Sequence, residues 1–190
     1  DALRESEERH RSFLNSFKGI AFQSTMDFEA IFFHGAVEAI TGYREDEFVR
    51  GNPKWNEVIY PEDIPIFCTE EEKKLHFVPH HAFEREYRII RKDGQMRWIH
   101  EVIQNVCDET HRPFLLQGTM YDITERKKME EALRESEGKY RALTDGAHDA
   151  IILADEHGSI LEVNKRAEEL LGYSKQELST MHIQRIHPKE

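Results

Sequence analysis

The chain has 190 residues, of which 38% are hydrophobic, and this size and composition allow one or two small domains but exclude a large enzyme. Its 26 Lys and Arg residues against 37 Asp and Glu residues give a formal charge of −11. That charge repels phosphate backbones and anionic headgroups, so we expect no nucleic acid among the partners. No apolar stretch approaches the roughly 20 residues needed to cross a bilayer, so we expect no direct membrane insertion.

The two cysteines, Cys68 and Cys107, are too few for a secreted disulfide framework. Free thiols of this kind are commonly buried in a protein core, and they indicate a reducing compartment. We therefore expect a cytoplasmic chain, either free or as the cytosolic part of a membrane protein.

The first expected element in chain order is an amphipathic helix over about residues 2–15, which Gly19 ends. Two short runs of aromatic and β-branched residues, 20–23 and 30–33, then predict a hairpin. The helical spacing of the first element comes from Leu3, Ser6, His10 and Phe13.

Two short helices separated at Gly42 are expected over residues 36–50. Pro61 suits the first turn of a longer helix, and Pro79 lies beyond its end. One face of that helix is marked by Ile64, Phe67, Cys68 and Leu75.

Three strand-like runs follow at 83–91, 96–107 and 113–121. Turn residues join them, so they are expected to form an antiparallel meander. This order predicts an α+β fold, in which a five-stranded antiparallel sheet carries helices on one face and amphipathic helices flank it.

The chain also contains an internal repeat with an offset of 130 residues. Residues 2–7 and 132–137 are identical, and Gly42-Tyr43 falls on Gly172-Tyr173. The second copy stops at Glu190, before the part that corresponds to the meander. Residues 146–190 should therefore form a strand pair and some helix, with an apolar face left exposed.

Three segments of the first copy resemble the PAS superfamily in their order along the chain. They are the turn Arg91-Lys92-Asp93-Gly94, the following Arg97-Trp98-Ile99, and the exit Asp122-Ile123-Thr124 into a charged helix. Earlier landmarks are Gly42-Tyr43 and Tyr60-Pro61-Glu62-Asp63. The resemblance implies a flanking helix at 1–14, a complete PAS domain at 15–122, a helical linker at 123–145, and the start of a second PAS domain at 146–190.

A PAS sheet and its helices enclose a pocket, and strand alternation indicates which side chains face it. Laid on the family pattern, Trp98, His100 and Val102 should lie on the opposite face, although a slip of one residue would invert this assignment. The ligand-pocket candidates are Tyr87, Ile89, Ile99, Glu101, Ile103, Leu116, Gly118 and Met120. Among them Glu101 attracts attention, because a carboxylate in a pocket must be paired, protonated or ligand-bound. A simple outward-facing strand Glu is the alternative.

The family's cofactors can be weighed in the same way, and which one the chain binds, if any, stays unknown at this stage. A flavin photosensor is not expected, since Pro53 stands where the reactive cysteine belongs and Ile89, Ile99 and Met120 fill the amide positions. Haem stays open, with Cys68 and His76 as weak ligand candidates, although Cys68 also suits a buried helix face. His80 and His81 complete a local His cluster that Pro79 interrupts, so we expect a solvated loop and no metal site.

Three classes of function fit these observations. The resemblance implies a sensory module of a multidomain receptor, most simply a two-component sensor histidine kinase, with a small-molecule ligand and an output domain in the same chain. A sensor part of a diguanylate cyclase and a non-sensing dimerisation adaptor are the alternatives. We find no Ser/His/Asp order, Gly-rich phosphate loop or zinc spacing, so the fragment itself should have no catalytic residues.

The linker carries the expected signal relay. Its apolar positions follow spacings of 4, 3, 4 and 3, which is typical of the seam of a left-handed coiled coil and predicts a homodimer. The seam consists of Met129, Leu133, Ser136, Tyr140 and Leu143. Packing of the helix on its own domain is the alternative. Asp122 or Thr124 should offer an oxygen to the first free amides of this helix and so set its direction.

Overall fold

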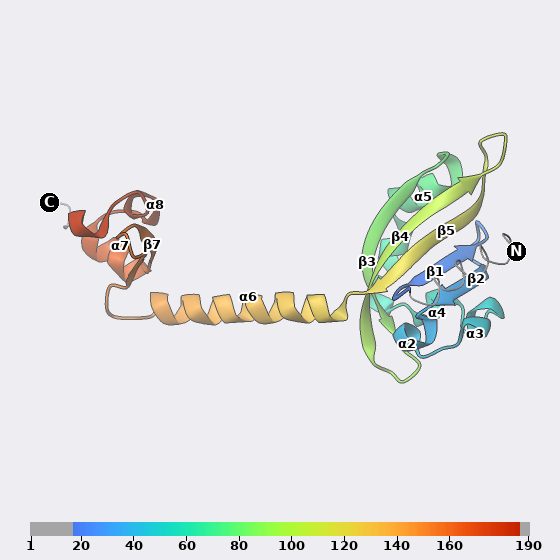
Figure 1. Ribbon diagram of the computed structural model, residues 1–190, viewed down its shortest axis with the longest axis horizontal. Coiled ribbons are helices and arrows are strands. Elements are labelled where there is room, and N and C mark those ends of the chain that lie inside the picture. The colour runs from blue at the N-terminus through green and yellow to red at the C-terminus, as the bar shows by residue number, and fades with distance from the viewer. Residues whose placement is uncertain (1–16, 187–190) are drawn as a thin grey trace, which may run out of the picture. The chain divides into compact units, whose positions relative to one another are not determined.

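The computed structural model describes residues 17–186, and the expected helix over 2–15 with its part of the seam lies outside them. Two compact units divide between Lys127 and Lys128. The first unit contains a five-stranded antiparallel sheet in the order β2-β1-β5-β4-β3. Figure 1 shows the short helices gathered over one face of this sheet. The expected α+β architecture is confirmed.

The strands of the first unit are β1 (Ile20–Ser24), β2 (Ala30–Gly35), β3 (Ala82–Ile90), β4 (Met96–Cys107) and β5 (Pro113–Asp122). Its helices are α2 (Val37–Thr41), α3 (Glu45–Val49), α4 (Trp55–Val58), the 3-10 helix η1 (Pro61–Cys68) and α5 (Glu70–Phe77). Alternate residues of the strands point under the helices and form one core.

The long helix expected after Pro61 is instead two helices. Pro65 lies within this segment. It has no amide hydrogen to donate to a helix, and its ring disfavours the α conformation of the residue before it, Ile64. Both effects suit the 3-10 geometry of η1. A new helix begins at Thr69, whose hydroxyl accepts a hydrogen bond from the Glu72 amide at 3.3 Å. The expectation that Cys68 lies on a buried helix face is wrong, because it is exposed. Ile64 is also half exposed.

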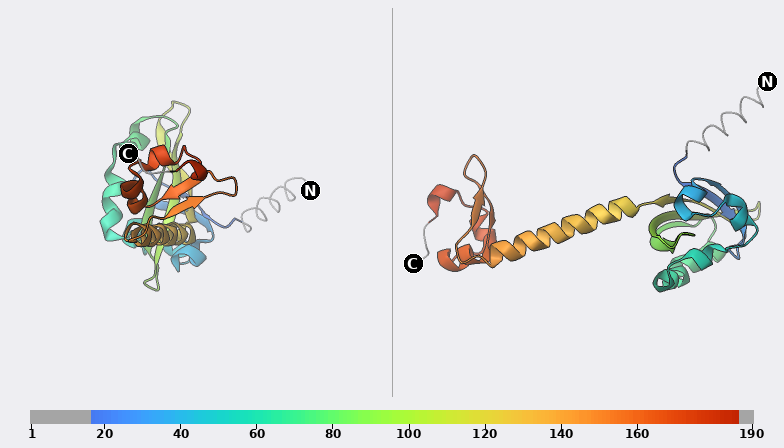
Figure 2. Two further views of the ribbon diagram at one scale, coloured as in Figure 1. Left: turned by 90° about the vertical axis from the view of Figure 1, so that its left-hand side faces the viewer. Right: turned by 90° about the horizontal axis from the view of Figure 1, so that it is seen from below.

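The second unit contains most of α6 (Thr124–Asp145), which begins in the first unit, then β6 (Ile152–Ala154), β7 (Ile160–Val163), α7 (Lys165–Leu171), α8 (Lys175–Leu178) and the 3-10 helix η2 (Ile183–Arg185). The right-hand view of Figure 2 shows α6 as one unbroken helix. The strands β6 and β7 form an antiparallel pair, and α7 and α8 pack against it around a small core that includes Ala167 and Leu178. Within residues 17–186, no helix is long and apolar enough to span a bilayer.

Candidate functional site

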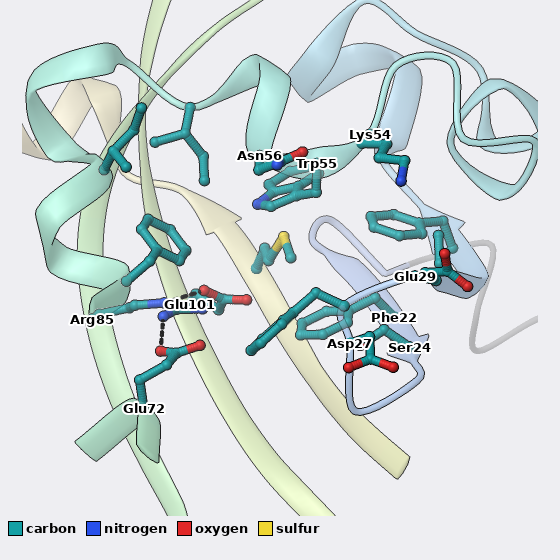
Figure 3. Close-up of a pocket in the computed structure, with 17 residues that line it drawn as sticks. Phe22, Ser24, Asp27, Glu29, Lys54, Trp55, Asn56, Glu72, Arg85 and Glu101 are labelled. Atoms are coloured by element: carbon teal, nitrogen blue, oxygen red, sulfur yellow. Dashed lines mark hydrogen bonds and ion pairs between the residues drawn. The ribbon is translucent and has the colours of Figure 1, made fainter. Parts of the chain in front are cut away.

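A cavity of about 360 Å³ lies between the sheet and the helices of the first unit (Figure 3). Its walls come from all five strands, the β1–β2 turn, α4, η1 and α5. The apolar wall consists of Phe22, Phe28, Ala30, Phe33, Trp55, Ile59, Ile64, Phe67 and Met120. The polar lining consists of Ser24, Asp27, Glu29, Lys54, Asn56, Glu72, Arg85 and Glu101.

The cavity's most buried polar feature is a cluster of one guanidinium and two carboxylates. Arg85 on β3 lies directly opposite Glu101 on β4, and its Nε donates to Glu101 Oε2 at 2.5 Å. Its Nη1 donates to Glu72 Oε2 from α5. All three side chains are at most 8% exposed. Figure 3 shows Arg85 between the two carboxylates. Glu101 is therefore a paired carboxylate that lines the cavity, and not an outward-facing strand residue.

The charges of this cluster do not cancel if both carboxylates are ionised. Desolvation by burial raises the pKa of the Glu72 carboxyl, which the positive charge of Arg85 only partly opposes. The Arg85 guanidinium also lies over the Phe67 ring, 3.9 Å from its centroid. The guanidinium is thus held by two carboxylates and an aromatic face.

Tyr87 links this wall to α4. Its hydroxyl accepts a hydrogen bond from Trp55 Nε1 at 3.0 Å, although the two residues are 32 positions apart. Burial raises the pKa of the Tyr87 phenol well above its usual range, so the group stays a neutral phenol. This bond fixes the Trp55 indole against the cavity.

The eight pocket candidates all lie on the three long strands, and seven of them are buried. Only Glu101 and Met120 line the cavity. Gly118 is partly exposed, and a Cβ there would lie 2.2 Å from the Val102 carbonyl oxygen, so it permits close strand packing. Tyr87, Ile89, Ile99, Ile103 and Leu116 belong to the core. Their role as ligand contacts stays a prediction.

Several lining residues were missed from the sequence. Arg85 precedes Tyr87 by two residues, so strand alternation alone could have placed it on the same face. Glu72 lies on the side of α5 that also buries Leu75, three residues later. The aromatic wall gave no comparable signal, because Phe22, Phe33 and Trp55 meet only after the chain has folded.

The structure shows where the residues considered as cofactor or metal ligands lie. Cys68 and His76 are exposed and line no part of the cavity, so they do not fit as axial ligands of a haem held there. Pro53 is likewise outside the cavity lining. His80 is exposed, and His81 Nε2 lies 3.0 Å from a Glu71 carboxylate oxygen. Among residues 17–186, no group of three metal-binding side chains converges.

The junction between β5 and α6 has a specific geometry. Asp122 Oδ1 accepts a hydrogen bond from the Thr124 amide at 2.8 Å, as expected for a residue that directs the start of the helix. The Thr124 hydroxyl does something else, because it accepts from the Trp98 amide of β4 at 2.9 Å. The Trp98 carbonyl in turn accepts from the Ile123 amide at 2.9 Å. Both backbone groups of Trp98 therefore bind the first residues of the linker.

The seam residues of α6 carry exposed apolar side chains. Met129 is 69% exposed, Leu133 61%, Tyr140 47% and Leu143 76%. Ser136 is exposed as well. The structure thus places these positions where a partner helix could cover them, and their role in a dimer stays a prediction.

Comparison with known proteins assigns the family. A family profile described as the PAS fold matches residues 30–120, and a second profile of the PAS fold matches residues 138–189. The chain belongs to the PAS family, as the sequence motifs indicated.

Three relatives illustrate the match. The crystal structure of a sensory box histidine kinase/response regulator from Burkholderia thailandensis shares the fold with a TM-score of 0.54 and 24% identity, over 70% of this chain and 98% of that one. Sensor protein FixL from Bradyrhizobium diazoefficiens is 30% identical over 108 residues, which are 57% of this chain and 21% of FixL. The probable diguanylate cyclase DgcE from Escherichia coli is 27% identical over 135 residues, which are 68% of this chain and 12% of DgcE. The chain spans 8% to 21% of the length of the curated relatives it matches.

Proposed function

We propose that the chain is the sensory region of a multidomain cytoplasmic receptor, with a histidine kinase as the output domain in the same polypeptide. A small molecule in the cavity of the first unit is the stimulus, and α6 carries the response toward the output. The two free cysteines, Cys68 and Cys107, suit the reducing cytoplasm. The proposed segments are the PAS domain at 15–122, the linker at 123–145 and a second PAS segment at 146–190.

One observation carries this proposal: the same strand lines the cavity and holds the start of the linker. Glu101 of β4 faces the cavity, and Trp98 lies three residues earlier on the same strand. The backbone of Trp98 binds Ile123 and Thr124 at the start of α6. A ligand that shifts β4 therefore shifts the base of the linker without any intervening loop.

The exposed seam of α6 supports a parallel homodimer. Two copies paired along it would cover Met129, Leu133, Tyr140 and Leu143. About four turns of seam with Ser136 inside it give only weak pairing, which suits a contact that slides or rotates with the signal. We expect Leu133→Glu to shift the chain toward monomer in size-exclusion chromatography with light scattering. Arg141→Ala, a change at an exposed position on the outer face of the helix, is the matched control.

Signal relay is tested at the junction. Asp122→Ala removes the oxygen that receives the Thr124 amide, so the receptor should stay folded while its autophosphorylation loses most of its response to stimulus. Asp108→Ala removes a similar turn carboxylate in the β4–β5 loop and serves as the control. Unchanged, stimulus-dependent output from a folded Asp122→Ala receptor would rule out this relay.

The output domain is tested by reading the gene on both sides of these residues. A phospho-acceptor helix followed by an ATP-binding domain supports the kinase. The similarity to DgcE makes a diguanylate cyclase the second candidate, which a cyclase domain in that place would establish. If the dimer forms but no small molecule changes the activity of the output domain, the chain would instead be a non-sensing dimerisation adaptor.

A further inference from the structure

The cavity of the first unit carries an excess of negative charge. Four carboxylates line it, against two cations. Asp27 and Glu29 are exposed at its rim, and Lys54 is exposed as well. The buried part holds Glu72 and Glu101 against Arg85 alone. A ligand that enters therefore meets an excess of carboxylates over cations, and its contacts with the buried ones lie out of bulk water, where charge matters more.

The Arg85 guanidinium already has two carboxylate partners, so its positive charge attracts a further anion only weakly. Its Nε and Nη1 already donate to Glu101 and Glu72, and one face covers the Phe67 ring. An anionic ligand would add a third negative charge to a buried cluster that holds a single positive charge. A cation would instead supply the charge that the cluster lacks.

Aromatic rings form much of the remaining wall. Phe22, Phe28, Phe33 and Trp55 line the cavity together with the Met120 side chain. The faces of such rings attract organic cations and also bury apolar groups. The wall thus suits a ligand that is apolar for most of its length and positively charged at one end.

The Ser24 hydroxyl is a further buried polar group of the cavity. Ser24 lines the cavity from β1 and is only 5% exposed, yet its hydroxyl makes no hydrogen bond within the part of the chain that the structure describes. Buried hydroxyls are normally hydrogen-bonded, because leaving one unpaired costs free energy. Figure 3 shows Ser24 and Glu101 in different parts of the cavity, so a ligand bonded to both would have to extend across it.

We propose that the cavity binds a small organic ammonium ion, with the charged nitrogen at Glu101, an apolar body against the aromatic wall and a hydrogen bond to the Ser24 hydroxyl. This inference rests on the proposed sensory function, for which it names the class of stimulus. Burial raises the pKa of the Glu72 carboxyl, and the nearby Glu101 carboxylate raises it further, so an additional cation beside the two carboxylates would favour their ionised forms.

The test uses the whole chain and three probes with one aromatic body. Phenethylammonium, phenethyl alcohol and phenylacetate differ only in their polar end, and isothermal titration calorimetry compares their affinities. A charge-assisted hydrogen bond should make the ammonium ion bind about tenfold or more tightly than the alcohol, with phenylacetate the weakest. Equal or stronger binding of the alcohol or phenylacetate overturns the proposal, and so does failure of the ammonium ion to bind at millimolar concentration.

Two variants locate the bound probe. Glu101→Gln should weaken phenethylammonium about tenfold, while Glu84→Gln, an exposed change on β3, should leave its binding unaltered. Ser24→Ala removes a hydroxyl without a partner, so the unliganded melting temperature should stay the same or rise. Its affinity for phenethylammonium should fall about twofold to tenfold. Binding that neither Glu101→Gln nor Ser24→Ala weakens would place the probe elsewhere and overturn the proposal.

These results are independent of the output. If phenethylammonium binds as described but leaves the kinase response unchanged, the sensory function fails and the binding site stands. If it does not bind while Asp122→Ala still uncouples the receptor, the sensory function stands and the stimulus belongs to another chemical class.

Discussion

The hairpin and short helices at the start of the first unit have a close counterpart in the second. Phe22 pairs with Phe33 across β1 and β2, and Ile152 pairs with Val163 across β6 and β7, with the same offset of 130 residues. The register shift after Gln23 recurs after Leu153. Both hairpins lead into a helix that ends at a left-handed glycine, Gly42 at φ 78° and Gly172 at φ 76°.

The two copies differ in how far corresponding side chains are buried. Ile40 is 4% exposed, whereas its counterpart Leu170 is 57% exposed. In the first copy the β3–β4 turn closes over this helix, where the Lys92 amide donates to the Thr41 carbonyl at 3.0 Å. The local sequence is therefore sufficient for the hairpin and the helices, but the three long strands are needed to close the core over them.

The largest expected contrast between the copies is in local stability. In hydrogen exchange on the whole chain, amides of β1 should exchange at least about a hundredfold more slowly than those of β6, because β1 is paired on both sides. Limited proteolysis should likewise trim the region from 146 onward first. A C-terminal region that outlasts the first unit would contradict this comparison.

Truncating one core side chain in each unit tests whether the two units unfold independently. Phe48 and Leu178 occupy corresponding sites and are 1% and 0% exposed. Phe48→Ala removes stacking on Phe33 and Trp55, and should lower the unfolding free energy of the first unit by about 3–5 kcal/mol. Both tryptophans, Trp55 and Trp98, lie in that unit, so their fluorescence in denaturant reports it alone. Leu178→Ala should leave this transition unchanged, and a shared shift would show that the two units unfold together.

A partly buried ion pair ties η1 to β3 and has no counterpart among the described residues of the second copy. Asp63 accepts from the Arg88 amide at 2.7 Å and from its guanidinium, which holds the pKa of the carboxyl below its ordinary value of 3.8. Asp63→Asn should cost about 1.5–3 kcal/mol of unfolding free energy at neutral pH.

The sign of the pH dependence follows from the lowered pKa. Stability from the pair is fully present above the unfolded value and is lost as the pH falls through the lower folded value. Wild type and Asp63→Asn should therefore differ by a constant amount from neutral to mildly acidic pH and converge in strong acid. Urea denaturation at several pH values measures this, and a gap that widens on acidification would refute it.

The smallest effect should come from the exposed helix position of the second copy. Leu170→Ala should change the exchange rates of α7 amides by less than the equivalent of about 0.5 kcal/mol, because the side chain is largely in solvent. Ile40→Ala, the matched change in the first copy, should cost about 2–5 kcal/mol. Similar costs at the two positions would mean that Leu170 is covered in solution.

The sequence alone determined the features that depend on neighbours along the chain. Strand alternation correctly separated the buried Tyr87 and Ile99 from the exposed Val102, since successive side chains of a strand point to opposite faces. The repeat placed both hairpins. Asp122 was recognised as a hydrogen-bond acceptor for the start of the linker helix, because such caps act within a few residues.

Only the tertiary structure decided the features that join distant segments. Which part of the buried face is left open as a cavity depends on how η1, α4 and α5 lie over the sheet, and alternation carries no information on that. Arg85 and Glu72 are 13 residues apart and meet only when α5 packs on β3. The Thr124 hydroxyl accepts from a strand amide 26 residues away, a partner that only the folded sheet brings to the start of the helix.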